Sequence, residues 1–399
     1  MKVLSAESPS PQHSALSTQH SDEHPRLRVA MLSKALVVGA YQKKAEELAR
    51  LPGVELTVLV PPRWTESGRT VRLERRFTQG YELVELPFLF DGHHHVHCYP
   101  TLWRELERLR PDVFHVDEEP YNLATFLAYL DGGRVGAKRV FFTWQNLYRR
   151  YPPPFRWMER WVLANSDGAI AGITAALDVF RRKGYRGPTA VIPQFGFDPE
   201  LFSPAPARPP RPFTIGYLGR LQERKGLLDL VDACAGLRGD WRLRFVGSGD
   251  LGDRLVARAT ELAVADRVDV LPPVGSTEVV GVYRGLDVVA LPSRTLPSWK
   301  EQFGRILPEG MACGAIPVGS DSGEIPHVIG DAGLVFPEGD VAALRAQLQR
   351  LIDGPALRAE LGARARERFL RRYTQAQVAR ATYDFYRSLL NSARASASD

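Results

Sequence analysis

This chain has few cysteines, no long apolar run and only a small net charge. Its 399 residues hold three cysteines, Cys98, Cys234 and Cys313, and none lies in a CxxC pair. This spacing excludes a disulfide framework and a structural zinc site, and it predicts a reducing compartment, the cytoplasm. No apolar run approaches the roughly 18 residues that a membrane span needs, which excludes an integral membrane protein.

The charge is a modest excess of basic side chains, with a formal net charge of +6 at neutral pH. Such an excess suits an anionic ligand or an anionic surface. Because the sequence contains no zinc-finger pattern and no aromatic RNA-binding motif, it does not indicate nucleic acid as a partner. Residues 1–25 are rich in Ser, Gln, His and Pro and lack the apolar segment of a signal peptide, so they are predicted to be a disordered tail.

Two series of alternating patterns follow the tail. Short β-branched runs such as "LRVAML" and "VELTVLV" alternate with amphipathic stretches, which predicts parallel strands separated by helices. The proline-rich stretch 205–212 separates the two series and is predicted to be a linker. We therefore predict an α/β fold with two tandem doubly wound Rossmann-like domains, with a single fused sheet as the alternative. The predicted segments are an amino-terminal domain at 26–204, a carboxyl-terminal domain at 213–373, a helix at 374–391 and a tail at 392–399.

The stretch "EQFGRILPEGMACG" places two carboxylates eight residues apart. Proline is tolerated in the first turn of a helix, so Pro308 predicts a helix that begins near Gly304 or Arg305. Glu301 then lies in the preceding loop and Glu309 just inside the helix, whose free amides suit a phosphate. Because two carboxylates would repel that phosphate, they more plausibly accept hydrogen bonds from sugar hydroxyls. The alternative is that both carboxylates serve only the helix start.

A second stretch, "IGYLGRLQERKG", combines a strand end with two cations. The strand ends at Leu218, and Gly219 permits close approach of the backbone. Arg220 and Lys225 follow in the loop before the next helix. Two fixed cations at this end of a parallel strand can neutralise the charge that develops on a diphosphate leaving group. A solvated surface loop is the alternative.

Together these stretches resemble a known site. "GYLGRLQERKG" followed by "EQFGRILPE", along with "VIPQFGFDPELFSP", "RFVGSGD" and "AGLVFPEGD", is similar to the nucleotide-sugar site of retaining glycosyltransferases of family 4, which have the GT-B fold. The resemblance extends over most of residues 27–390. It implies a diphosphate held by Arg220 and Lys225, and a ribose bound by Glu309. It also implies a donor sugar held by Glu301 with the backbone around Phe303, Gly304 and Arg305.

The resemblance also implies the reaction. A sugar would pass from a nucleoside diphosphate sugar, such as a UDP- or GDP-sugar, to an acceptor hydroxyl with retention of anomeric configuration, and with no metal or other cofactor. The carboxyl-terminal domain would bind the donor, and the amino-terminal domain would bind a glycan, lipid-linked or small-molecule acceptor. The helix at 374–391 would cross back onto the amino-terminal domain. Rival hypotheses are a nucleotide-sugar epimerase or phosphorylase of the same fold, and a noncatalytic nucleotide-sugar-binding protein.

Two segments of the amino-terminal half carry further candidates. Gly39 follows the first strand and is expected near the donor diphosphate; its alternative role is to serve the turn alone. In "DVFHVDEEP", strand alternation places His115 and Asp117 on one face at the carboxyl end of a predicted strand. Relatives often carry HxHEP here, so Asp117 replaces a histidine. We expect an acceptor contact from His115, Asp117 or a neighbouring acid, and the alternative is a hydrogen-bonded strand end.

Two further segments have competing interpretations. The histidines of "DGHHHVHCYP" invite a metal site, but consecutive ligands in a loop do not converge, which favours an acceptor-cleft or surface loop. In "NLYRRYPPPFRWMERWVLA", arginines alternate with aromatic side chains. Trp157, Trp161 and Val162 have the spacing of a core face. The alternative is peripheral contact with an anionic membrane surface.

Overall fold

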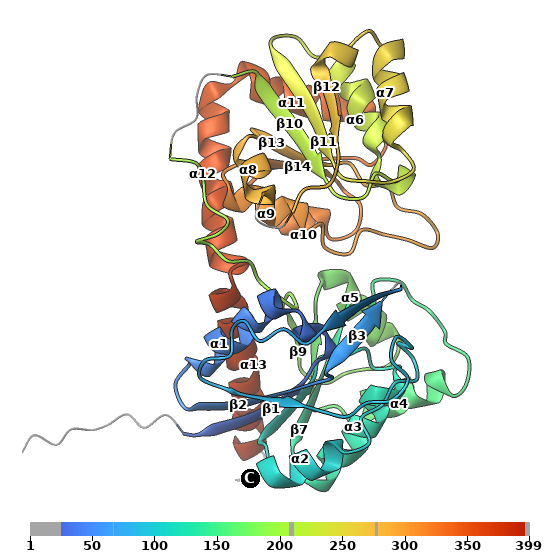
Figure 1. The fold of residues 1–399 in the computed structure, drawn as a ribbon, viewed down its shortest axis with the longest axis vertical. Helices are drawn as coiled ribbons and strands as arrows, with labels where there is room; N and C mark the ends of the chain where they lie inside the picture. The colour runs from blue at the N-terminus through green and yellow to red at the C-terminus, as the bar shows by residue number, and fades with distance from the viewer. Residues whose placement is uncertain (1–24, 67, 207–210, 276–277, 396–399) are drawn as a thin grey trace, which may run out of the picture.

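The computed structural model describes residues 25–66, 68–206, 211–275 and 278–395, in two domains joined at one side (Figure 1). The predicted tail at 1–25 lies almost entirely outside the described residues, and so does half of the predicted linker at 205–212. Each domain is built on one parallel sheet, so the predicted pair of doubly wound α/β domains is confirmed.

The first domain contains a sheet of seven strands in the order β5-β2-β1-β6-β7-β8-β9. These strands are β1 (Leu27–Leu32), β2 (Val54–Val60), β5 (Glu82–Glu85), β6 (Val113–Val116), β7 (Lys138–Thr143), β8 (Gly168–Ala171) and β9 (Thr189–Val191). The helices are α1 (Lys43–Ala49), α2 (Leu102–Leu109), α3 (Leu123–Arg134), α4 (Phe155–Ala164) and α5 (Thr174–Arg182). A separate antiparallel ribbon, β3 (Arg63–Glu66) with β4 (Arg69–Arg72), projects toward the second domain (Figure 1).

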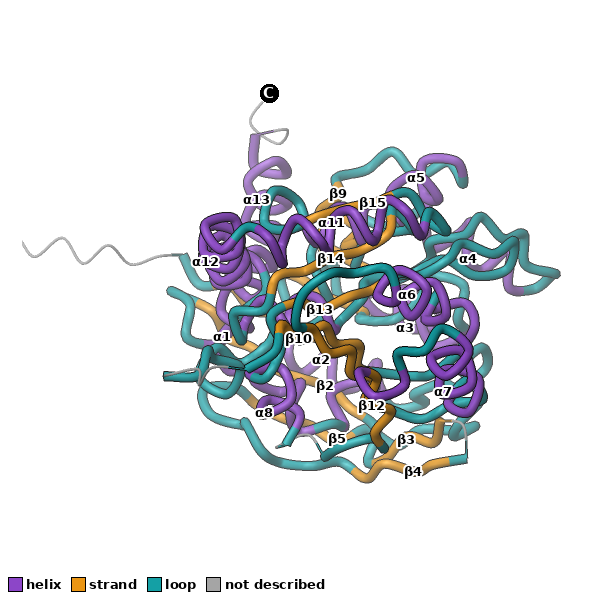
Figure 2. The backbone as a smooth tube through the Cα atoms, turned by 90° about the horizontal axis from the view of Figure 1, so that it is seen from above, coloured by secondary structure: helices purple, strands orange, loops and turns teal. Residues whose placement is uncertain are grey.

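The second domain repeats this plan with the order β12-β11-β10-β13-β14-β15. Its strands are β10 (Phe213–Leu218), β11 (Trp241–Val246), β12 (Val268–Leu271), β13 (Val288–Leu291), β14 (Ile316–Ser320) and β15 (Leu334–Phe336). Its helices are α6 (Leu227–Ala235), α7 (Gly252–Glu261), α8 (Val279–Arg284), α9 (Ile306–Ala312), α10 (Ile325–Ile329) and α11 (Val341–Asp353), and helices surround the sheet when it is seen from above (Figure 2). Strand order reverses beside β10, and doubly wound sheets bind ligands at such a reversal.

Two long helices close the chain and link the domains. Helix α12 (Pro355–Arg372) lies along the second domain, and α13 (Gln375–Ala395) continues along the first (Figure 1). Helix α13 extends past residue 391, where the sequence predicted its end. The carbonyl of Tyr373 accepts a hydrogen bond from the Phe197 amide at 2.8 Å, and the Gln375 amide donates to the Phe197 carbonyl at 3.1 Å. The two segments that pass between the domains are therefore bonded to each other.

Helix α4 corrects one predicted core residue. The side chains of Met158 and Val162, four residues apart, are buried, whereas Trp157 is 61% exposed. The predicted core face is thus right for Val162 and for Trp161, which packs against the core, and wrong for Trp157, which is exposed. Across the described ranges, no helix is both long and apolar enough to cross a membrane.

Candidate active site

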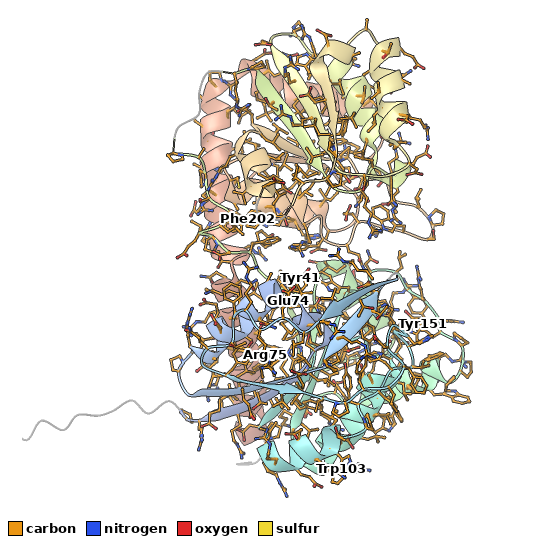
Figure 3. All side chains as sticks on the ribbon, viewed as in Figure 1. Tyr41, Glu74, Arg75, Trp103, Tyr151 and Phe202 are labelled. Atoms are coloured by element: carbon orange, nitrogen blue, oxygen red, sulfur yellow. The ribbon has the colours of Figure 1, made fainter. Side chains whose placement is uncertain are left out.

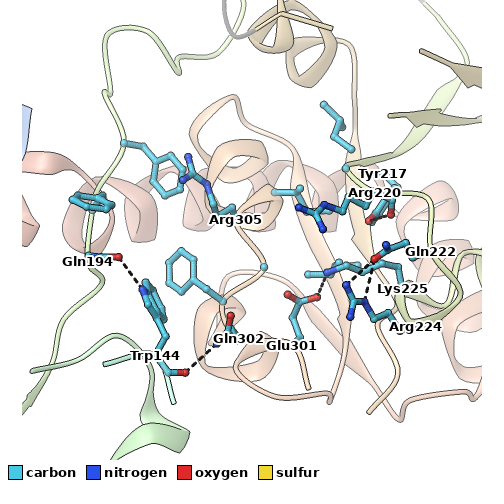
Figure 4. Close-up of a pocket in the computed structure, with 18 of the residues that line it drawn as sticks. Trp144, Gln194, Tyr217, Arg220, Gln222, Arg224, Lys225, Glu301, Gln302 and Arg305 are labelled. Carbon is cyan, nitrogen blue, oxygen red and sulfur yellow. Dashed lines mark hydrogen bonds and ion pairs between the residues drawn. The ribbon is translucent and has the colours of Figure 1, made fainter. Parts of the chain in front are cut away.

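A cavity of about 690 Å³ lies between the two domains (Figure 4). Its wall in the second domain is formed by the end of β10, the loop before α6 and the loop before α9. These loops follow strand ends at the reversal of strand order, as expected for a doubly wound sheet. The cavity brings together seven of the residues singled out in the sequence: Gly219, Arg220, Lys225, Glu301, Phe303, Gly304 and Arg305.

Glycine allows the loops after β10 and β11 to pack closely at one end of the cavity. Gly219 has a φ of 140°, and its amide donates to the Val246 carbonyl at 2.9 Å. A Cβ on Gly247 would lie 1.8 Å from the Gly219 carbonyl oxygen, so no side chain fits there. Arg220 follows directly and is exposed to the cavity. Among the described residues, no carboxylate is within ion-pair distance of Arg220, so its charge is available to a ligand.

Lys225 and Glu301 form an ion pair in the lining of the cavity. Their Nζ and Oε2 atoms are 2.6 Å apart, and the two side chains are 17% and 8% exposed (Figure 4). The Ser293 hydroxyl donates to the same carboxylate oxygen at 2.7 Å. Trp299 covers the lysine, with its ring centre 4.8 Å from the Lys225 ammonium. This pairing fixes the cation and the carboxylate at a set separation before any ligand binds.

Helix α9 begins at Ile306, close to the predicted start, after Gly304 with a φ of 72°. A Cβ on Gly304 would lie 2.5 Å from a Leu291 methyl group, so glycine is required at this turn. Glu309 lies in the first turn of the helix, where it accepts a hydrogen bond from the Tyr283 hydroxyl at 2.7 Å. Burial raises the pKa of Glu309. Its side chain lies behind the cavity rather than in its lining.

The first domain lines the cavity with residues that the sequence analysis missed. The Arg305 guanidinium donates to the Tyr41 hydroxyl at 3.2 Å and so bridges the domains. Tyr41 stacks on Phe195 at a ring separation of 4.2 Å, at the edge of the first domain that faces the second (Figure 3). The Trp144 indole donates to Gln194 at 2.9 Å. Tyr41 and Trp144 are far in sequence from Gln194 and Phe195, and although "VIPQFGFDPELFSP" contains the last two, no local signal assigned any of the four to the cavity.

Gly39 does not line the cavity. Its amide donates to the Glu74 carboxylate at 2.8 Å, and a Cβ at this position would lie 2.7 Å from the same carboxylate. The chain's own carboxylate thus occupies the amide that we expected near the donor diphosphate. The structure therefore agrees with the alternative role, in which Gly39 serves the turn.

The structure also separates His115 from the cavity. His115 lies on β6 and Asp117 directly follows that strand, and both are buried. The His115 ring is within 2.6 Å of the Tyr386 hydroxyl on α13, and burial lowers its pKa. Asp117 accepts hydrogen bonds from Ser33 at 2.6 Å and from Gln194 at 3.1 Å. Asp117 therefore acts on the cavity wall through Gln194, whereas His115 packs against the crossing helix.

The acids beside Asp117 are also buried in hydrogen-bonded networks. Glu118 pairs with Lys34 and with His97, whose Nε2 lies 3.1 Å from the carboxylate, and these two partners hold the pKa of Glu118 well below its usual range. The predicted histidine loop thus contributes His97 as a buried hydrogen-bond partner of Glu118. Within the described part of the chain, no cluster of three or more His, Cys, Asp or Glu side chains could hold a metal.

Glu119 supports the cavity wall from behind. Its carboxylate accepts hydrogen bonds from the Thr143 hydroxyl at 2.6 Å and from the Trp144 amide at 2.8 Å. Burial outweighs these bonds and raises the pKa of Glu119 to about 7.

Comparison with known proteins assigns the chain to a family. The family model for Glycosyltransferase Family 4 matches residues 43–201, and the model for glycosyl transferases group 1 matches residues 199–368. The two matches are contiguous and span both domains. The chain belongs to glycosyltransferase family 4.

Curated relatives of this chain include D-inositol 3-phosphate glycosyltransferases. The protein from Saccharomonospora viridis is 32% identical over 262 residues, which are 60% of this chain and 59% of the relative. The protein from Stackebrandtia nassauensis is 30% identical over 288 residues, 64% of each chain. The chain therefore spans about three fifths of the length of these relatives.

Solved structures confirm the GT-B fold of the chain. Sucrose-phosphate synthase from Thermosynechococcus elongatus matches with a TM-score of 0.65 at 19% identity, over 92% of this chain and all of that one. Anabaena HepE in complex with UDP matches with a TM-score of 0.65 at 17% identity, over 91% of this chain and all of that one.

Proposed function

We propose that this glycosyltransferase transfers a sugar from a nucleoside diphosphate sugar to an acceptor hydroxyl with retention of anomeric configuration. The observation that carries the proposal is the convergence of Arg220, Lys225 and Glu301 on one cavity between two domains. Cations suit the diphosphate and the carboxylate suits sugar hydroxyls. The family membership, the fold and the UDP bound by Anabaena HepE support the same reading.

The donor would lie along the second domain. Arg220 and Lys225 would hold its diphosphate, and Glu301 would accept hydrogen bonds from its sugar. A smaller cavity of about 290 Å³ adjoins Arg220 and is lined by Gly219, Gly247, Ser248, Pro273 and Val274. We assign the nucleobase to this cavity, since glycine backbone and apolar side chains suit a flat ring. The family resemblance assigns the ribose to Glu309, whose carboxylate lies behind the cavity lining and is bonded to the Tyr283 hydroxyl.

Departure of the diphosphate is the step that these residues assist. When the bond between the sugar C1 and the diphosphate oxygen breaks, negative charge grows on the diphosphate, and fixed cations stabilise that charge most strongly. The acceptor oxygen would form its bond to C1 on the face that the diphosphate leaves, while the hydroxyl proton passes to the departing diphosphate oxygen, and this retains the configuration. Arg220 and Lys225 supply the positive charge, so the proposal includes no metal ion.

Product analysis tests this proposal. The protein is incubated with UDP-, GDP- and ADP-linked α-glucose and a panel of hydroxyl acceptors, and products are examined by mass spectrometry and NMR. The expected product is an acceptor carrying an α-linked sugar, identified by its small anomeric coupling constant. A β-linked product contradicts retention. Release of free sugar or sugar phosphate without dependence on acceptor favours an epimerase or phosphorylase, and donor binding without turnover favours a noncatalytic protein.

A further inference from the structure

Charge is divided between the two walls of the interdomain cavity. The second domain lines it with four cationic side chains, Arg220, Arg224, Lys225 and Arg305. Among the described residues of the first domain that line it, none is Lys, Arg or His, and the one charged side chain is Glu66 at the end of β3. A phosphorylated ligand is therefore attracted to one wall and repelled from the other.

The lysines of the first domain that follow β1 are engaged elsewhere. Lys34 pairs with Glu118 and lies over the Trp64 ring. Lys44 is 2% exposed and donates to the Gln194 carbonyl at 2.9 Å. Lys43 has Glu46 and Glu47 within 3.5 Å and 3.8 Å. None of these three lysines lines the cavity, so the first domain supplies no counter-charge of its own to a phosphate; the cation that reaches this wall, at Tyr41, is Arg305 of the second domain.

The same wall is built to accept a neutral ring. Tyr41 stacked on Phe195 presents one aromatic surface, and the Trp144 ring, anchored by Gln194, presents another. Aromatic faces carry partial negative charge and attract the C–H groups of a sugar or cyclitol ring. Glu66 has no ion-pair partner among the described residues, so its carboxylate can accept hydrogen bonds from ring hydroxyls.

We propose that the acceptor ring that enters this cavity is a neutral polyhydroxylated ring, a sugar or cyclitol without phosphate, held by Tyr41, Trp144 and Glu66. This inference rests on the proposed function and specifies its acceptor. Selectivity arises from two features of the first-domain wall: the aromatic side chains favour any such ring, and Glu66 rejects a phosphomonoester by like-charge repulsion.

Matched acceptor pairs test the proposal. The full chain, with the donor that gives transfer, is assayed with glucose against glucose 6-phosphate and with myo-inositol against its 3-phosphate. We expect kcat/KM for the neutral member to exceed that for the phosphate ester at least about 100-fold. In Glu66→Gln we expect this ratio to fall at least about tenfold, because the repulsive charge is removed. Glu85→Gln, a half-exposed carboxylate on the edge strand β5, should leave the ratio unchanged.

The outcomes separate this inference from the proposed function. Equal or better use of a phosphate ester, or a ratio unaltered in Glu66→Gln, overturns the neutral acceptor while transfer itself stands. Binding of donor nucleotide with no transfer to any neutral ring also overturns it. Absence of both donor binding and transfer instead removes the proposed function on which the inference depends.

Discussion

Replacing Lys225 with alanine is expected to lower kcat/KM for sugar transfer by about 10²–10³-fold, the range seen when one preorganised group that stabilises developing charge is removed. Two effects combine in this variant. The departing diphosphate loses a cation, and Glu301 loses the partner that lies 2.6 Å away. The carboxylate then adds its own charge next to the anionic leaving group. Steady-state kinetics with both substrates varied measures the loss.

Two controls isolate the role of the cation. Lys225→Arg keeps the charge and should recover part of the activity, because the guanidinium differs in shape but not in sign. Lys138→Ala removes a comparable ion pair, to Asp167 at 2.9 Å, far from the cavity, and should leave kcat/KM unchanged. Thermal unfolding of each variant reports whether the fold persists. Near-normal turnover in a folded Lys225→Ala protein would falsify the role assigned to this residue.

Changing Glu119 to glutamine is expected to remove a component of the pH dependence of stability. Burial raises the pKa of this carboxyl from 4.5 to about 7, so the folded state binds the proton more tightly than the unfolded state does. The stability of the wild-type protein should therefore decline as pH rises from about 4.5 to 7. Each pKa unit corresponds to about 1.4 kcal/mol. The free energy of unfolding of the wild-type protein should therefore be about 3 kcal/mol lower above pH 7 than below pH 4.5.

Glutamine keeps the contacts of Glu119 without the charge. Its carbonyl can accept from the Trp144 amide, and its amide can donate to the Thr143 hydroxyl. Urea unfolding at pH 5 and pH 8 should show the variant gaining stability relative to the wild type by up to about 3 kcal/mol between these conditions. Glu360→Gln, at a half-exposed site on α12, serves as the control and should show no such gain. An equal pH dependence in Glu119→Gln and wild type would contradict the raised pKa.

The sequence predicted the sheets and the second-domain side of the cavity because their signals are local. Strands such as Phe213–Leu218 are continuous apolar runs, since both faces of a parallel sheet are covered. The cationic loop and the stretch from Glu301 to Glu309 each lie within a few residues of a strand or helix end. Short-range rules for strand ends and helix starts therefore suffice to place them.

The first-domain side of the cavity depends on contacts that no local rule gives. His115 meets Tyr386, 271 residues later in the chain, and this contact draws its ring into the core. Trp144 and Gln194 meet across 50 residues. The ribbon of β3 and β4 was missed because its residues, "RWTE" and "RTVR", are mostly polar. A cytoplasmic location and peripheral membrane contact stay predictions.

Calorimetric titration with UDP, GDP and ADP tests the donor site most directly. The account predicts that one of these nucleotides binds the wild-type protein, and that its affinity falls at least about tenfold in Arg220→Ala, because the exposed guanidinium in the cavity contacts the diphosphate. Arg350→Ala, on the outer helix α11, should bind as the wild type does. Unchanged nucleotide affinity in Arg220→Ala, or binding of none of the three to the wild type, would contradict the central claim that this cavity holds a nucleoside diphosphate sugar.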